Sequence, residues 1–304
     1  MSTATETLEF NGVEIADTFA EGFSIVGTRL IITAATEAWA EIAGAEISGY
    51  ATSVIACDAE VSVEKALTVD ETSDGRPGVS ILMFAFNKKK LEKAVANRVG
   101  QCILTCPTTA CFNGLTDVER DKTISMGGQL RFFGDGFQIS KKLGDRRYWR
   151  IPVMDGEFLC EDRVGTQKGV AGGNLLICGV DQSSALIAAE AAVVAMRKIA
   201  GVGLPFPGGI VRSGSKVGSK YKKLVASTNE AYCPTLQAQV ETALPSGTGC
   251  VYEIVIDGLT FEVVQEAMRV GLHAACQCAG VLRISAGNYG GKLGPHHFHL
   301  KDLL

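Results

Sequence analysis

The sequence is poor in the features that mark several large classes of protein. Its 304 residues include two tryptophans, four histidines and eight prolines, and the formal net charge is −4. This charge argues against a polycationic surface for nucleic acid. The longest apolar stretch, 185–195, is interrupted by Glu190, whereas a membrane-spanning helix needs roughly 20 apolar residues. The N-terminal sequence MSTATETLEF has no basic run and no apolar core, so no secretory signal is predicted.

Metal-binding and nucleophilic motifs are also scarce. No C-x2-C pair occurs among the ten cysteines, so neither a zinc nor an iron–sulfur site is predicted. Without a secretory signal, the cysteines are expected to be free thiols in a reducing cytoplasm. Most would be small core residues, and Cys233, beside a turn, is the candidate for a reactive thiol. No G-x-S-x-G elbow is present, and His297 and His299, on one face of a terminal strand, are more typical of a surface strand end.

Glycine, in contrast, is abundant, with 35 residues. Glycine-rich segments lie at 168–174, 205–211, 213–220 and 285–294, and their spacing fits neither a P-loop nor a dinucleotide fingerprint. Each could be a tight turn, but their concentration in the second half of the chain favours a substrate cleft. Lys292 could meet an anionic substrate tail there. The candidate substrate-binding residues are Gly208, Gly209, Ser215, Lys216, Asn288, Gly290, Gly291 and Lys292.

An approximate internal repeat predicts the fold. Buried-strand runs at 30–34 and 175–179 lie 145 residues apart, and each is followed by an N-cap candidate, Thr36 or Asp181, and a helical pattern. The further predicted strands are 52–57, 79–86, 101–106, 208–214, 251–257 and 281–286, with helices at 87–100 and 260–276. Each half therefore has the β-α-β-β-α-β order of a ferredoxin-like lobe. We expect an α+β protein, a duplicated α/β sandwich with lobes at 1–150 and 151–304, and a short hairpin at 129–137.

One acidic residue stands out in this pattern. Glu253 lies inside the predicted strand VYEIVID, with Val251 and Val255 on its own face. It is either an edge residue that faces water or a carboxyl placed against an apolar floor. In the second case burial would disfavour its charged form, so Glu253 is a candidate acid/base group near neutral pH.

Several longer segments resemble one known family. NGVEIADTFAEGF, RVGQCILTCPTTACFNGL, PFPGGIVRSGSKVGSK, VYEIVIDGL, EAMRVGLHAAC and ISAGNYGGKLG are similar to segments of formylmethanofuran:tetrahydromethanopterin formyltransferases. The resemblance runs from about Leu8 to Leu304. It implies two ferredoxin-like lobes in one subunit, and it places the family's proposed acid/base glutamate, in the VYEIV strand, at Glu253.

The resemblance also implies an activity and partners. The expected enzyme binds no cofactor and moves a formyl group between the amine of methanofuran and N5 of tetrahydromethanopterin, both acting as co-substrates. Homodimers or homotetramers are implied, with hydrolase-type subunits as further partners in a bacterial complex. Backbone N–H groups of the glycine-rich loops could stabilise the tetrahedral oxyanion. Two alternatives stay open: a non-catalytic scaffold subunit of a one-carbon enzyme complex, and a thiol-based redox or metal protein.

Overall fold

A computed structural model describes residues 8–304, so residues 1–7, where the N-terminal sequence begins, lie outside the described part of the chain. The α-helices are α1 (Glu37–Ser48), α2 (Lys88–Arg98), α3 (Gly127–Leu130), α4 (Gln182–Met196) and α5 (Phe261–Ala275). The strands are β1 (Leu8–Phe10), β2 (Val13–Ile15), β3 (Phe19–Thr33), β4 (Glu60–Leu67), β5 (Gly78–Ala85), β6 (Ala110–Asn113), β7 (Thr123–Ser125), β8 (Ile139–Leu143), β9 (Arg146–Val153), β10 (Gly156–Glu161), β11 (Arg163–Gly165), β12 (Gln167–Gly179), β13 (Val202–Gly203), β14 (Lys216–Val217), β15 (Ala226–Ser227), β16 (Cys250–Gly258), β17 (Val281–Ser285) and β18 (His296–His299). Within residues 8–304, no helix is both long and apolar enough to cross a membrane.

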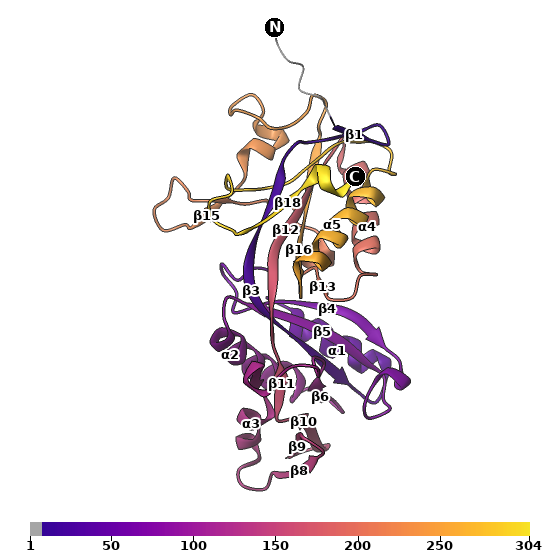
Figure 1. The fold of residues 1–304 in the computed structure, drawn as a ribbon, viewed down its shortest axis with the longest axis vertical. Helices are drawn as coiled ribbons and strands as arrows, with labels where there is room; N and C mark the ends of the chain where they lie inside the picture. The colour runs from indigo at the N-terminus through magenta and orange to yellow at the C-terminus, as the bar shows by residue number, and fades with distance from the viewer. Residues whose placement is uncertain (1–7) are drawn as a thin grey trace.

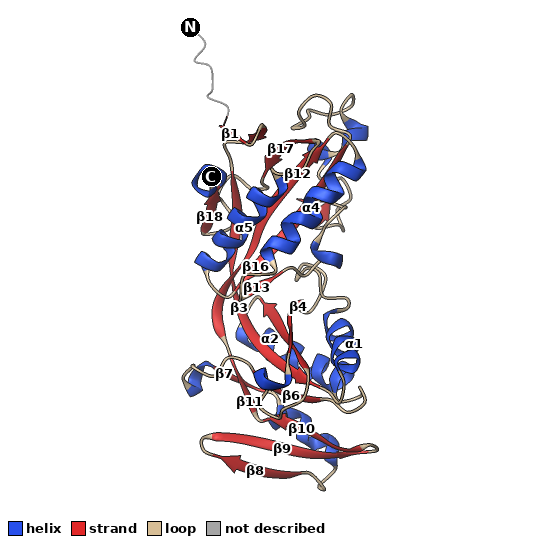
Figure 2. Cartoon of the chain, turned by 90° about the vertical axis from the view of Figure 1, so that its right-hand side faces the viewer, coloured by secondary structure: helices blue, strands red, loops and turns tan. Residues whose placement is uncertain are grey.

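Two long strands connect an upper and a lower lobe (Figure 1). The start of β12 pairs antiparallel with the middle of β3, and both strands belong to one 14-stranded sheet. In the lower lobe the pairing order is β4-β5-β3-β6, and in the upper lobe it is β13-β16-β12-β17, antiparallel throughout. Helices α1 and α2 pack on the lower strands, and α4 and α5 on the upper ones (Figure 2). The chain therefore combines helices with a large mixed sheet, as the predicted α+β class requires.

Each lobe has its own hydrophobic core. The lower core contains buried residues between Leu30 and Val164, from β3 to β11. The upper core contains residues between Val170 and Leu303, joined by Val13, Ile15 and Ala20 from the start of the chain. A small third cluster lies where the lobes meet, formed by Ile25, Leu82, Phe84, Leu115, Ala171 and Leu259. Residues from both the first and the last part of the chain therefore contribute to the core of the upper lobe.

Most of the predicted repeat elements are present. The predicted strands at 30–34, 79–86, 175–179, 251–257 and 281–286 fall in β3, β5, β12, β16 and β17. Both predicted N-caps are confirmed. Thr36 Oγ1 accepts the Trp39 N–H at 3.3 Å, and an Asp181 carboxylate oxygen accepts the Ser184 N–H at 2.8 Å. These bonds satisfy backbone donors that the first turn of a helix leaves free.

Two strand predictions in the lower lobe are wrong. Residues 101–106 instead continue α2 as a π-helical turn, Val99–Ile103, in which the Leu104 N–H reaches Val99 O at 2.8 Å. Val99 and Ile103 are both buried, and their spacing of four is a helical period rather than a strand period. Residues 52–57 form a turn in which Ser53 O accepts two N–H groups, and the strand of that region is β4.

Two further predictions fail because of local backbone geometry. The segment 208–214 forms only a single bridge, between Val211 and Glu253, because Gly208, Gly209 and Gly214 have φ of +65°, +88° and +56°. The expected hairpin at 129–137 is replaced by α3 and a 3₁₀ turn, Arg131–Gly134, which ends at Asp135 with φ +49°. Strand geometry requires negative φ, so a continuous strand is interrupted at these residues in both segments.

Candidate active site

Glu253 lies on β16, on the sheet face that points away from the helices. Its neighbours Ile254 and Ile256 point the other way, into the core under α4 and α5. On one side, Val211 exchanges backbone hydrogen bonds with Glu253 at 2.7 and 3.0 Å. On the other side, Leu176 of β12 lies directly opposite Glu253. The backbone of Glu253 is therefore paired on both sides rather than lying on a free edge.

The surroundings of the Glu253 carboxyl are apolar, with polar groups at the border. Leu176 also pairs with Ser285 of β17, so Glu253, Leu176 and Ser285 form one row across the sheet. The Ser285 hydroxyl shares a 3.0 Å hydrogen bond with Tyr232 Oη. Burial raises the pKa of Tyr289, and the negative charge of Glu253 raises it further, which places this phenol near the carboxyl.

Burial raises the pKa of Glu253 to about 7. No hydrogen bond from a described residue lowers the pKa of this carboxyl, so the cost of partly removing its charge from water is not offset. At neutral pH such a group exchanges readily between acid and carboxylate. This is the property expected of a general acid/base residue.

The glycine-rich loop 285–294 lies beside this face and is held by Glu21 of β3. The Glu21 carboxylate accepts backbone N–H bonds from Tyr289 and Leu293 at 2.6 Å each, and from two glycines of the loop, Gly291 at 2.9 Å and Gly294 at 2.6 Å. Glu21 is 1% exposed. A buried carboxylate with four donors is well stabilised in its charged form.

A second anchor holds the start of the same loop. The side-chain amide of Asn174, on β12, accepts the Gly287 N–H at 2.6 Å and donates to Gly287 O at 3.2 Å. Asn288 donates to Thr18 Oγ1 at 3.0 Å, and its own amide oxygen accepts the Gly290 N–H. Within this loop the N–H groups of Tyr289, Gly290, Gly291, Leu293 and Gly294 are therefore already bonded inside the protein. Oxyanion stabilisation by backbone N–H groups of the other glycine-rich loops stays a prediction.

The other predicted binding residues are spread over the upper lobe. Lys216 of β14 forms an ion pair with Glu230, and Ser215 immediately precedes β14. Gly209 packs against Val193 of α4. Gly208 lines a cavity of about 530 Å³ between the end of α1, β4 and the segment 202–208. Asn288, Gly290, Gly291 and Lys292 therefore share one loop, whereas Gly208 and Gly209 lie in a different region, next to the 530 Å³ cavity and α4.

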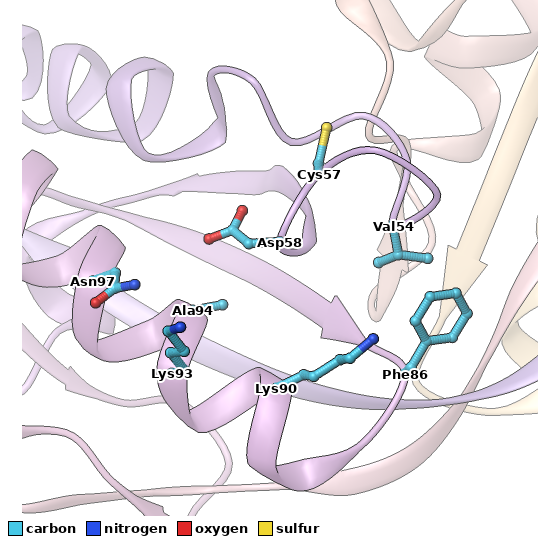
Figure 3. A pocket seen from close by; sticks show the side chains of 8 residues that line it. All are labelled: Val54, Cys57, Asp58, Phe86, Lys90, Lys93, Ala94 and Asn97. Carbon is cyan, nitrogen blue, oxygen red and sulfur yellow. The ribbon is translucent and has the colours of Figure 1, made fainter. Parts of the chain in front are cut away.

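A smaller cavity of about 330 Å³ lies in the lower lobe between the turn at 54–58 and α2 (Figure 3). Lys90 and Lys93 of α2 border it, and the Lys90 ammonium lies 4.9 Å from the centre of the Phe86 ring. Neither cavity is lined by Glu253. Glu253 therefore lies outside both cavities.

Sequence reasoning missed Glu21, Asn174, Tyr232, Ser285 and Tyr289. Two of them carried a usable signal, because Glu21 and Asn174 are polar residues inside apolar strand patterns, FAEGF and GGNLLICG. The role of Glu21 depends on contacts with residues about 270 positions away, and no local pattern encodes such a contact.

The other sequence candidates have ordinary structural contacts. The Cys233 thiol, half-buried, donates to Asn229 O at 3.3 Å, and its reactivity stays a prediction. The rings of His297 and His299 both lie near the Phe19 ring, with ring centres 4.7 and 5.1 Å from it, and they lie 6.5 Å from each other. Residues 8–304 contain no group of three or more His, Cys, Asp or Glu side chains placed to hold a metal ion.

A half-buried carboxyl with a raised pKa, held beside an anchored glycine-rich loop, is an arrangement found in enzymes that use general acid/base catalysis. The chain belongs to the formylmethanofuran-tetrahydromethanopterin formyltransferase family. The family model matches residues 8–153, and the model of the family's proximal lobe matches residues 156–303.

Named relatives match this chain over nearly its whole length. It is 57% identical over 298 residues to a formylmethanofuran–tetrahydromethanopterin formyltransferase of Methylobacillus flagellatus, covering 97% of this chain and 99% of that protein. It is 55% identical over 303 residues to a subunit of the formyltransferase/hydrolase complex of Methylorubrum extorquens, covering 97% and 96%. The Methanopyrus kandleri formyltransferase is 51% identical over 298 residues, covering 97% and 100%.

Two solved structures share the fold. The formyltransferase of Methanosarcina barkeri superposes with a TM-score of 0.92 at 48% identity, covering 98% of this chain and 100% of that one. The formyltransferase/hydrolase complex of Methylorubrum extorquens, solved with methylofuran, contains a chain with a TM-score of 0.94 at 54% identity, covering 98% and 99%. The similarity therefore extends across both lobes.

Proposed function

We propose that this protein transfers a formyl group between the amine of methanofuran and N5 of tetrahydromethanopterin. Family membership over both lobes supports this activity, and it disfavours the alternative of a non-catalytic scaffold. The single structural observation that supports it most is Glu253, a half-buried residue whose carboxyl pKa is raised by burial to about 7.

The chemistry requires one proton-transferring group and two well-placed carriers. N5 of the pterin attacks the formyl carbon, and a new C–N bond forms as the carbonyl becomes tetrahedral. The old C–N bond then breaks and the methanofuran amine leaves, which requires a proton on its nitrogen. Glu253 donates that proton, and its carboxylate then takes up the proton that N5 loses on acylation, so the acid form is restored; the reverse reaction uses the same two transfers. Proximity of two bound carriers contributes up to roughly 7–11 kcal/mol in well-oriented reactions.

The direct test is an activity assay on the purified protein. Mixed with formylmethanofuran and the reduced pterin, the folded protein should produce formyl-pterin, followed by its absorbance. A folded protein that produces none, alone or with the hydrolase-type subunits added, would contradict the proposal. Asn288, Gly290, Gly291 and Lys292 stay candidate substrate-binding residues because they share the loop next to Tyr289 and the Glu253 face.

Activity without a bound cofactor or metal is a further part of the proposal. The reaction described above needs an acid/base group and no redox partner, and no three-ligand metal cluster occurs in the described residues. We therefore expect chelator treatment followed by desalting to leave kcat within about twofold of the untreated enzyme. A stoichiometric metal that is removed together with activity, and restores activity when returned, would contradict this expectation.

We also infer that each lobe is ferredoxin-like, with a boundary near residues 150–151. The two equivalent pairing orders, β4-β5-β3-β6 and β13-β16-β12-β17, support the first statement. The predicted boundary lies inside β9, which pairs with β10 in the lower lobe. Expression of 1–150 and 151–304 as separate chains would test whether either part folds alone.

Association with other chains is the last part of the proposal. A relative with 55% identity is named as a subunit of a formyltransferase/hydrolase complex, and we infer a homodimer or homotetramer here, able to join hydrolase-type subunits, in the cytoplasm. All ten cysteines are free thiols, as expected in a reducing compartment. Sedimentation over a dilution series should show the oligomer dissociate and kcat fall together. A monomer that keeps full activity at nanomolar concentration would contradict the prediction.

A further inference from the structure

Two buried carboxyl groups meet where the upper and lower lobes join. Glu60, on β4 of the lower lobe, is 7% exposed, and Asp257, on β16 of the upper lobe, is fully buried. The two side chains lie within hydrogen-bonding reach of each other. Figure 2 shows β4 and β13 close together at this junction, and β13 pairs with β16 around Asp257. Two ionised carboxylates in contact at a buried site would repel each other strongly.

The hydrogen bonds of each carboxyl show how this contact is made. The Val54 N–H donates to Glu60 Oε1 at 3.0 Å, and the Gly172 N–H donates to Asp257 Oδ1 at 3.3 Å. The other oxygen of each group, Glu60 Oε2 and Asp257 Oδ2, is buried and has no donor among the described residues. Each carboxyl therefore has one oxygen bonded to the backbone and one left over. A bond between the two remaining oxygens requires a hydrogen on one of them.

Two local features of the backbone support the contact between Glu60 and Asp257. The pairing of β12 with β16 is irregular between Val170 and Gly173, and this irregularity places the Gly172 N–H at Asp257. Gly203, on β13, would bring a Cβ to within 2.9 Å of Ser62 Oγ, which is buried and has no described partner. Glycine at 203 therefore allows β13 to approach β4 closely.

No described basic side chain neutralises the pair. The nearby acidic residues have partners of their own: Glu64 binds Arg29, Asp58 binds Arg98, and Glu21 binds the loop 285–294. Burial raises the pKa of both Glu60 and Asp257, and for Asp257 the neighbouring charge of Glu60 raises it further. The hydrogen bond from the Val54 N–H lowers the pKa of Glu60, but it does not cancel the increase caused by burial.

We propose that Glu60 and Asp257 share one proton between Glu60 Oε2 and Asp257 Oδ2, and that this bond is a proton-dependent clamp between the two lobes. The clamp lies next to the 530 Å³ cavity, because Val61, Ser62 and Val63 of β4 and Val202 of the facing segment line that cavity. The stability that this clamp contributes is present at low pH, and it is lost as pH rises through the pKa of the pair. The native chain keeps a proton that the unfolded chain has already released above about pH 5.

The experiment measures the folding equilibrium constant of the full-length protein by urea unfolding between pH 5 and 8. Because burial also raises the pKa of Glu253, all variants carry Glu253→Gln to remove that contribution. One extra bound proton should decrease the folding constant by up to about tenfold per pH unit. In Asp257→Asn the side-chain amide donates an N–H to Glu60 at every pH. The folding constant of this variant should therefore lose the part of the pH dependence that comes from the shared proton. At pH 8 it should exceed the folding constant of the parent.

Further variants separate the clamp from a general effect of mutation. Glu60→Gln should remove the same pH dependence, and the double variant with Asp257→Asn should remove no more, since only one proton is shared. Glu64→Gln, on the same strand, should leave the slope between pH 5 and 8 unchanged. Burial would raise the pKa of Glu64, but the bonds from Arg29 and Ser80 outweigh it and lower that pKa.

An infrared measurement tests the proton directly, because a protonated carboxylic acid has a C=O band distinct from that of a carboxylate. That band should be present at pH 7 in the parent and absent in Asp257→Asn. An unchanged slope in Asp257→Asn would overturn the proposal. So would one equivalent of a metal ion in the purified protein that is lost in both single variants, since a cation would then bridge Glu60, Asp257 and Ser62.

Discussion

Replacing Glu253 by glutamine is expected to decrease kcat by a factor of about 10²–10⁴, with little change in KM. Glutamine keeps the shape of the side chain and its hydrogen-bonding reach, but it cannot donate or accept a proton in the reaction. General acid/base catalysis contributes about this factor in enzymes that depend on it. Binding of the two carriers does not require proton transfer, so the loss should appear in kcat. Steady-state kinetics with both carriers varied would measure it.

Two observations make this prediction specific to proton transfer. The wild-type kcat should change with an apparent pKa near 7, because burial raises the pKa of Glu253 to about that value, and this transition should vanish in Glu253→Gln. The matched control is Glu241→Gln, an exposed residue of the same lobe, which should keep wild-type kcat and the wild-type pH profile. If Glu253→Gln keeps more than about a tenth of wild-type kcat, Glu253 is a positioning or structural residue.

The repeat predicted the elements that pack on the cores, and the reason is local. Leu91, Ala94 and Val95 recur at helical spacing and are buried in α2, and Thr36 and Asp181 cap their helices as short-range chemistry requires. Glu253 stands out as a candidate for a similar reason, since one acidic residue interrupts an apolar strand pattern, and its catalytic role stays a prediction. Such features depend on a few neighbouring residues, so they can be predicted without the rest of the chain.

The predictions that failed concern segments whose structure depends on contacts with distant parts of the chain. The run at 101–106 is apolar enough for a strand, but it continues a helix because Val99 and Ile103 pack on the lower core. Asp257, four residues after Glu253 on the same face of β16, was not singled out, because its partner Glu60 lies in the other lobe. The two cavities are likewise bordered by residues from distant parts of the chain, and a single sequence contains no sign of such neighbours.

Replacing Glu21 by alanine is expected to destabilise the upper lobe by roughly 3 kcal/mol or more, because hydrogen bonds to charged groups contribute roughly 1.5–3 kcal/mol each. The substitution leaves the backbone N–H groups of Tyr289, Gly291, Leu293 and Gly294 without their shared acceptor. Loss of this anchor should also displace Tyr289 from the Glu253 face. Urea unfolding monitored by far-UV circular dichroism, together with kcat, would measure both effects.

The pH dependence of this anchor has the opposite sign to that of the Glu60–Asp257 pair. Burial alone would raise the pKa of Glu21, but four backbone N–H bonds outweigh it and hold that pKa below its usual value. The contribution of Glu21 to stability is thus complete above about pH 5, and it is lost as pH falls through the lowered pKa. Glu21→Ala should therefore unfold more easily than wild type at pH 7 and approach it at acid pH. Glu9→Ala, an exposed glutamate on β1, should match wild type throughout, and a Glu21→Ala protein of wild-type stability at pH 7 would show that the loop is held by other contacts.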